Sequence, residues 1–153
     1  MTAGHSACWG ACAALTVALV APLAGCSEDD TPSAAVSKAA SAAQSAVSEA
    51  TAAAGRQLDE IKDGLDVKGA ATVGTPDTKS GRAAVEVTVD NTTGSTKSFA
   101  VQVDFTDWDG NTLDAVVVTV SDVPAGKSGT GTARSNRKLA GEVKAEVARA
   151  IRY

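Results

Sequence analysis

Aromatic side chains are scarce in this sequence: its 153 residues include two Trp, two Phe and one Tyr. Ala, Val, Ser, Thr and Gly dominate instead, so a hydrophobic core must be built mainly from valine and alanine. Burial of apolar surface contributes roughly 25 cal/mol per Å², and small side chains offer little such surface. We therefore expect one small domain of modest stability.

Charged residues are absent from the first 26 positions, where no Lys, Arg, Asp or Glu occurs. Residues 11–24 are almost wholly apolar, but Pro22 interrupts the run and leaves about a dozen usable positions, whereas a membrane-spanning helix needs about 20. An apolar run of this length at the start of a chain is typical of a secretion signal peptide, which we assign to residues 1–25.

The apolar stretch closes on Leu23-Ala24-Gly25-Cys26, which resembles the lipobox of bacterial lipoproteins. The resemblance implies that the Cys26 thiol receives a diacylglyceryl group and that the chain is cut just before this residue. Two acyl chains, at about 0.8 kcal/mol per buried CH₂, suffice for stable anchoring. We therefore expect a lipoprotein at the extracytoplasmic face of the bacterial cell membrane, attached through Cys26. An ordinary signal peptide followed by a chance cysteine is the alternative.

Removal of residues 1–25 would also remove His5, Cys8 and Cys12, so that the mature chain would have one cysteine and no histidine. This composition excludes intrachain disulfides, Ser-His-Asp and Cys-His nucleophilic centres, and metal sites with His or Cys ligands. We expect a non-enzymatic protein without a cofactor.

Residues 26–64 comprise the lipidated cysteine and an Ala- and Ser-rich spacer. A helix start is indicated by Thr31-Pro32-Ser33, with a capping hydroxyl before a proline. Val36, Val47 and Leu58 recur every eleven residues, close to three helical turns, so they share one stripe. The pattern predicts a solvated helical stalk.

The end of this stalk, Arg56 to Asp63, is its most amphipathic part. We expect Leu58 and Ile61 to dock on the following domain and Gly64 to end the helix. A disordered spacer and a coiled coil between several copies are the alternatives to a single stalk.

From Leu65 to Tyr153 apolar residues alternate with polar ones, and turn residues recur every eight to twelve positions. This rhythm predicts a mainly β fold, a small immunoglobulin-like β-sandwich. Strands are expected at 83–90, 99–105, 112–120, 129–134 and 142–153. The run Val116-Val117-Val118 indicates burial on both faces or a bulge. In the last strand, four side chains are expected on one side: Val143, Ala145, Val147 and Ile151.

A resemblance to a known family also lies in this region. The segment Phe105-Thr106-Asp107-Trp108-Asp109, between turns at Asn91-Thr92 and Pro124-Ala125-Gly126, resembles the FxLYD domain of prokaryotic extracytoplasmic proteins. The family's Phe, aromatic and Asp would fall on Phe105, Trp108 and Asp109, with Asp107 at the leucine position. The resemblance covers about residues 67–151 and implies an immunoglobulin-like sandwich, but no activity.

Several carboxylates crowd the hairpin after residue 103, namely Asp104, Asp107, Asp109 and Asp114. They suggest a calcium site, with Asp107, Asp109 and Asn111 as candidate ligands, or an acid–base pair of an envelope hydrolase. The spacing does not fit an EF-hand loop, since with Gly110 as its glycine the first ligand would fall on Phe105. Turn chemistry explains Asp109-Gly110-Asn111 without a metal.

Basic residues gather towards the C-terminus, where seven Lys or Arg after Val123 stand against two acids in a chain of net charge −4. Arg134, Arg137 and Lys138 are candidate contacts for an anionic envelope polymer or lipid headgroup, or form a solvated face. The acidic balance argues against nucleic acid as a partner. We expect an envelope module that binds another envelope protein or an anionic polymer, with a hydrolase or metal-binding module as the alternative.

Overall fold

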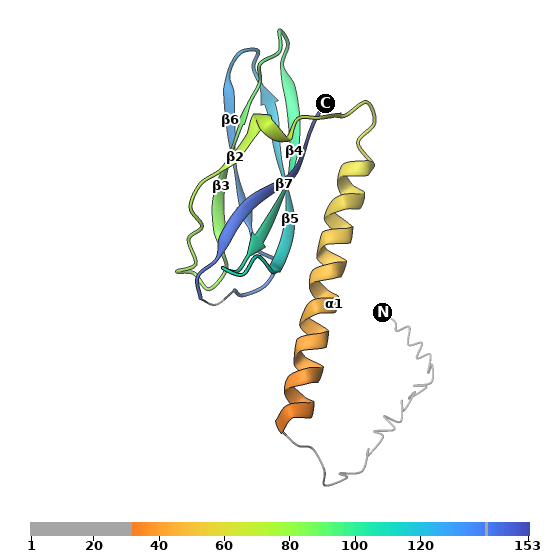
Figure 1. Cartoon of the computed structure of the whole chain (residues 1–153). Coiled ribbons are helices and arrows are strands. Elements are labelled where there is room, and N and C mark those ends of the chain that lie inside the picture. The colour runs from red at the N-terminus through yellow and green to blue at the C-terminus, as the bar shows by residue number, and fades with distance from the viewer. Residues whose placement is uncertain (1–31, 140) are drawn as a thin grey trace, which may run out of the picture.

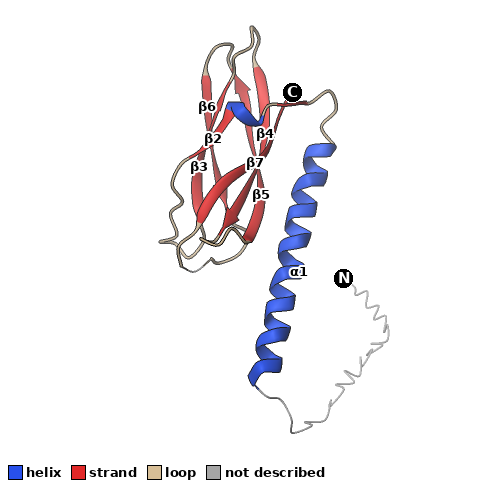
Figure 2. Cartoon of the chain, viewed as in Figure 1, coloured by secondary structure: helices blue, strands red, loops and turns tan. Residues whose placement is uncertain are grey.

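The computed structural model describes residues 32–139 and 141–153, so the predicted signal peptide and Cys26 lie outside the described residues. A long helix stands beside a mainly β unit (Figures 1 and 2). In chain order the elements are α1 (Pro32–Asp59), β1 (Leu65–Asp66), a short 3-10 helix η1 (Lys68–Ala70), β2 (Ala71–Val73), β3 (Ala84–Asp90), β4 (Lys97–Thr106), β5 (Thr112–Val123), β6 (Ser128–Arg134) and β7 (Lys144–Arg152).

The strands form two antiparallel sheets, with the orders β1-β7-β4-β5 and β2-β3-β6. The alternating side chains predicted to be buried in β3 and β4 are buried, and they face each other across the main core. This arrangement is consistent with the predicted β-sandwich. The core is built largely from valine, and its two phenylalanines, Phe99 and Phe105, have no exposed surface.

The valine run of β5 has side chains packed on both faces, with Val116 buried and Val117 and Val118 half-buried. Val116 is buried in the main core and Val118 packs against it, whereas Val117 packs against Leu58 of α1 on the outer face. The pairing of β5 with β4 is regular from Phe105↔Asp114 to Phe99↔Val120, so no bulge interrupts the run. Of the two alternatives, the structure shows packing on both faces, with partial burial at Val117 and Val118.

Two glycines allow β6 to lie close to β5. A Cβ atom on Gly129 would lie 2.7 Å from Val123 Cγ2 and 2.8 Å from Val120 Cγ1. A Cβ atom on Gly131 would lie 3.1 Å from Val120 Cγ2. At these two positions the lack of a side chain on β6 lets the valines of β5 lie directly against its backbone.

In β7 the prediction for Ile151 is wrong. Val143, Ala145 and Val147 pack against the main core, but Ile151 lies on the opposite face with Leu58, and Ala150 takes the core position. The register with β4 shifts between Gln102↔Arg149 and Val103↔Val147, so one residue, Ala148, is added. An added residue in a strand exchanges the two faces beyond it.

Asn91 joins two of the predicted turns and is itself almost completely buried. Its side-chain amide donates hydrogen bonds to the carbonyl oxygens of Val123 (2.8 Å) and Pro124 (3.2 Å), and its side-chain oxygen accepts one from the Thr93 hydroxyl (2.6 Å). The turn after β3 and the turn after β5 are thereby held together at one end of the sandwich.

Helix α1 confirms the helical form of the spacer from Pro32 to Asp59. Its residues 38–46 are exposed, and among them serines satisfy their hydroxyls locally: Ser45 Oγ donates to the carbonyl of Ser41 at 3.0 Å. The C-terminal part docks as expected, because Leu58 is 1% exposed and packs with Ala100 and Ile151, and Ile61 packs against this cluster. Among the described residues no helix has the length and apolar character needed to cross a membrane.

The prediction that the helix ends at Gly64 is wrong, because α1 ends five residues earlier, at Asp59. Gly64 has a different role, because a Cβ atom there would collide with Ile151 Cγ2. The absence of a side chain lets the connection pass closely over β7. Arg149 of β7 donates a hydrogen bond to Asp59 Oδ1 at 2.6 Å and so contacts the last residue of the helix.

Candidate functional site

The carboxylates of the β4–β5 hairpin do not form one cluster. Asp114 pairs across the strands with Phe105, which points into the core, whereas Asp104 pairs with Ala115 and lies on the outer face. Since neighbouring residues of a strand point to opposite faces, Asp104 and Asp114 are separated by the sheet itself. Asp104 accepts a hydrogen bond from Gln102 Nε2 at 3.0 Å. Asp104 and Asp114 therefore do not form the hypothetical acid–base pair.

Asp107 holds the turn of the hairpin. Its carboxylate accepts hydrogen bonds from Asn111, one from the backbone N–H at 2.8 Å and one from the side-chain amide at 2.9 Å. The side-chain bond from Asn111, followed by the backbone bond, lowers the pKa of Asp107 below its ordinary value of 3.8. The candidate metal ligands Asp107 and Asn111 thus bond each other, and Asp109 is exposed beside them.

Asp114 has no exposed surface and is fully engaged. One carboxylate oxygen accepts a hydrogen bond from the backbone N–H of Ala115 at 3.0 Å, and the other accepts one from the backbone N–H of Asn136. Arg137 Nε lies 3.9 Å from the same carboxylate. The residue ties the β6–β7 loop to β5. Across the described part of the chain, no three His, Cys, Asp or Glu side chains are grouped as a metal site requires.

Trp108 is exposed at the tip of the same hairpin, with 64% of its surface accessible. The Nζ atom of Lys144 lies over the indole ring, 3.7 Å from its centroid, in a cation–π contact. Of the three positions matched to the FxLYD motif, Phe105 is a core residue, while Trp108 and Asp109 are on the surface.

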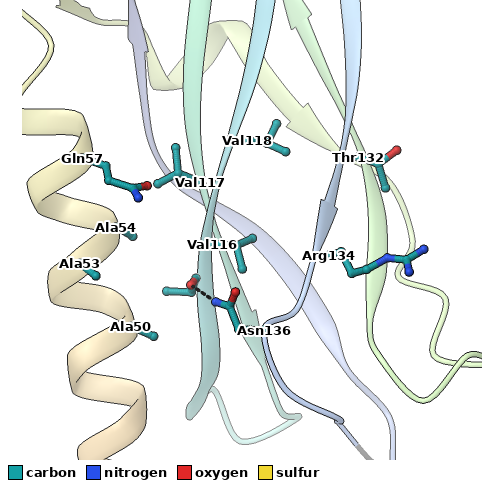
Figure 3. Close-up of a pocket in the computed structure, with 11 residues that line it drawn as sticks. Ala50, Ala53, Ala54, Gln57, Val116, Val117, Val118, Thr132, Arg134 and Asn136 are labelled. Atoms are coloured by element: carbon teal, nitrogen blue, oxygen red, sulfur yellow. Dashed lines mark hydrogen bonds between the residues drawn. The ribbon is translucent and has the colours of Figure 1, made fainter. Parts of the chain in front are cut away.

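The three candidate anion contacts lie in different environments. Arg134 is exposed at the end of β6, and Lys138 is exposed in the β6–β7 loop. Arg137 is half-buried and faces Asp114. Arg137 and Lys138 border one hollow beside α1, whereas Arg134 lies on β6 at the border of another and its guanidinium points away from the helix (Figure 3).

Two adjoining hollows follow α1 along β5, and together we call them the α1 groove. The upper hollow, of about 480 Å³, lies between helix residues Ala50 to Gln57 and strand residues Ala115 to Val118 (Figure 3). The lower hollow, of about 380 Å³, lies between helix residues Ala43 to Val47, the start of β5, and the loop segment Arg137 to Leu139. Volumes of this size are typical of small-molecule sites.

The groove exists because the helix docks at one end. Leu58 and Ile61 are large enough to fill the space against the sheet, whereas the positions one to four turns earlier on the same stripe are mostly alanine. In Figure 3 the short side chains of Ala50 and Ala54 point from α1 towards β5, and the longer side chain of Gln57 lies beside Val117. Small side chains at these positions leave the outer face of β5 partly uncovered.

The lining of the α1 groove combines aliphatic, neutral polar and cationic side chains. More than half of its residues are Ala, Val or Leu, and neither hollow is lined by an Asp or a Glu. Arg137 and Lys138 border the lower hollow, and Arg134 borders the upper one, although its guanidinium extends away from the helix (Figure 3). This composition contrasts with the net charge of −4 of the whole chain.

Sequence reasoning identified the three basic residues but not the groove that they border. Two signals pointed towards it: the thin alanine stripe of α1 and the Val116-Val117-Val118 run with a second buried face. The lipidation site Cys26 and the lipobox residues Leu23, Ala24 and Gly25 precede the described residues. Comparisons of the chain with protein-family models, curated proteins and solved structures found no match.

Proposed function

We propose that this chain is a lipid-anchored, extracytoplasmic binding module without enzymatic activity. The observation that carries the proposal is the sequence Leu23-Ala24-Gly25-Cys26 at the end of an uncharged, apolar N-terminal stretch. Acylation of Cys26 would place the folded unit at the outer surface of the cell membrane, with α1 as the segment next to the anchor. Two acyl chains are sufficient for stable attachment.

The binding role is supported by the lower hollow of the α1 groove, whose mainly apolar walls and cationic border suit an apolar, anionic partner. An anionic envelope component fits this lining better than a nucleic acid, because the chain as a whole is acidic, with a net charge of −4. A non-enzymatic role agrees with the absence of histidine after Cys26 and with the structural duties of Asp107 and Asp114.

An immunoglobulin-like classification of the sandwich belongs to the same proposal. In such domains strands B and E share one sheet with A, and strands C and F share the other. Here β3 and β6 share a sheet with β2, and β4 and β7 share the second sheet. The short strand β1 pairs with β7 at the position where the last strand, G, would lie. This order supports an immunoglobulin-like topology closed by an N-terminal strand.

Metabolic labelling with an alkyne analogue of palmitate tests the anchor. The full chain and Cys12→Ala, which keeps Cys26, should be labelled and recovered with membranes. Cys26→Ala should lose the label and membrane attachment through lipid. Labelled, membrane-bound Cys26→Ala protein would refute the proposed site of attachment.

A further inference from the structure

The border of the α1 groove carries positive charge that no acidic side chain of its lining balances. Lys138 is exposed beside the lower hollow, and Arg137 next to it shares its charge with the buried Asp114, whose carboxylate lies 3.9 Å away. No acidic side chain lines either hollow. The lower hollow is walled by apolar groups that include Val47, Leu113 and Leu139. Charge complementarity therefore calls for a ligand with one anionic end and an apolar body.

The shape of the groove favours a chain-like apolar body. The lining residues of α1 extend from Ala43 to Gln57, which corresponds to about 21 Å at 1.5 Å per residue. An acyl chain in one leaflet covers about 15 Å, half of the ~30 Å hydrocarbon core. The lower hollow is mainly apolar, and its apolar walls are aliphatic, as suits a flexible alkyl chain rather than a flat ring. The upper hollow adds the polar side chains of Gln57, Thr132 and Asn136, and no aromatic side chain is among the lining residues of either hollow.

A peptide strand fits the same place less well. Strand β5 lies at the edge of its sheet, but the backbone groups of Ala115 that face away from β4 are already bonded. Its N–H donates to Asp114 Oδ1 at 3.0 Å, and its carbonyl accepts a hydrogen bond from Asn136 Nδ2 at 3.3 Å. Strand addition depends on a row of free backbone groups, and this row is interrupted at Ala115, near the start of β5.

We propose that the α1 groove binds one acyl chain of an anionic membrane lipid, with its headgroup beside Arg137 and Lys138 and the chain along Val117. The groove would thus take a lipid from the membrane in which the protein is anchored. The location of this lipid source rests on the proposed function, since Cys26 lies six positions before Pro32, the first residue of α1. The binding chemistry itself depends only on the described residues.

The test uses the full chain in a Cys26→Ala background, so that a covalent lipid cannot contribute. A fluorescent fatty acid is titrated as the probe and is displaced by phosphatidylglycerol or by phosphatidylcholine of the same chains. We expect saturable binding and stronger displacement by the anionic lipid. Lys138→Gln should reduce affinity for the fatty acid several-fold, with little effect on its methyl ester, whereas Lys127→Gln, an exposed control outside the groove, should leave both unchanged.

Helix variants give matched pairs for the walls. Ala43→Glu and Ala50→Glu place an acid in the lower and upper hollows, and we expect each to weaken fatty acid binding at least tenfold. Ala42→Glu and Ala52→Glu put the same charge on neighbouring exposed positions that do not line the groove, and they should bind like the parent. Circular dichroism checks that each variant folds. If Ala50→Glu fails to fold, Lys138→Gln remains the decisive variant.

Equal binding by the members of each pair, equal displacement by both phospholipids, or binding only of an acidic peptide would overturn the lipid assignment. Failure of Cys26 labelling with retention of groove binding would remove the anchor and leave the groove assignment intact. Labelling of Cys26 without groove binding would support the anchor and refute the groove assignment. The two proposals are therefore tested separately.

Discussion

Asp114 and Asn136 join strand β5 to the β6–β7 loop through two hydrogen bonds. The Asp114 carboxylate accepts a hydrogen bond from the backbone N–H of Asn136, and the side-chain amide of Asn136 donates one to the carbonyl of Ala115. The two residues are 22 positions apart in the chain. Their contact fixes the start of the β6–β7 loop, which carries Arg137 and Lys138, against β5. The position of the cationic border of the α1 groove therefore depends on a buried carboxylate.

Replacement of Asp114 by alanine should destabilise the protein by about 3 kcal/mol, because hydrogen bonds to charged groups contribute about 1.5–3 kcal/mol and the buried N–H groups would lose their acceptor. Urea denaturation followed by circular dichroism measures the change. Asp109→Ala, at an exposed position of the same hairpin, should stay within about 0.5 kcal/mol of the parent. Equal stability of the two variants would contradict the role assigned to Asp114.

Gly129→Ala should destabilise the sandwich by about 1–3 kcal/mol, the usual range for overpacking. The added Cβ atom would lie 2.7 Å from Val123 Cγ2, and the β5–β6 contact would have to open. Gly94→Ala is the matched control, because nothing lies within 4 Å of its Cβ position. Thermal unfolding of both variants compares them, and a Gly129 variant as stable as the Gly94 variant would show that β6 yields without cost.

The strands that could be predicted from the sequence are those with uninterrupted alternation. In β3 and β4 every second side chain is apolar, and the buried face followed directly. In β7 the added residue Ala148 exchanges the two faces of the strand. Alternation could not reveal this bulge, because β7 carries alanine and other apolar residues on both of its faces. The prediction for Ile151 failed for this reason.

The candidate site was less accessible to sequence reasoning, because it depends on contacts between distant segments. The opposite orientations of Asp104 and Asp114 follow from the hairpin register, which includes an irregularity between Phe105 and Thr106. Likewise, the α1 groove requires the docking of Leu58 on β4 and β7. The row of alanines along the helix does not indicate which strands it lies against. The sequence did indicate that Leu58 docks, but not onto which strands.

Leu58→Ala should release α1 from the sheet, since Leu58 is 1% exposed and removal of a buried leucine costs about 2–5 kcal/mol. We expect faster amide hydrogen exchange in residues 50–59 and earlier proteolytic cleavage after Arg56. Leu65→Ala, with its side chain 56% exposed, serves as the control and should exchange like the parent. Unchanged protection of α1 in Leu58→Ala would mean that other contacts hold the helix.

The Asp107–Asn111 pair predicts a pH effect in the hairpin turn. The pKa of Asp107 is lowered below 3.8 in the folded protein, so its contribution to stability is present above that value and is lost as the pH falls through the lower, folded pKa. Carboxyl carbon NMR titration should show Asp107 titrating below pH 3.8. Asn111→Ala should raise the pKa of Asp107 towards that value, because it removes the side-chain hydrogen bond that contributes most to the lowering and keeps only the backbone donor. Asn136→Ala, whose side chain bonds Ala115 instead, should leave the titration of Asp107 unchanged. A normal pKa for Asp107 in the parent protein would contradict the turn geometry on which the assignment of these carboxylates rests.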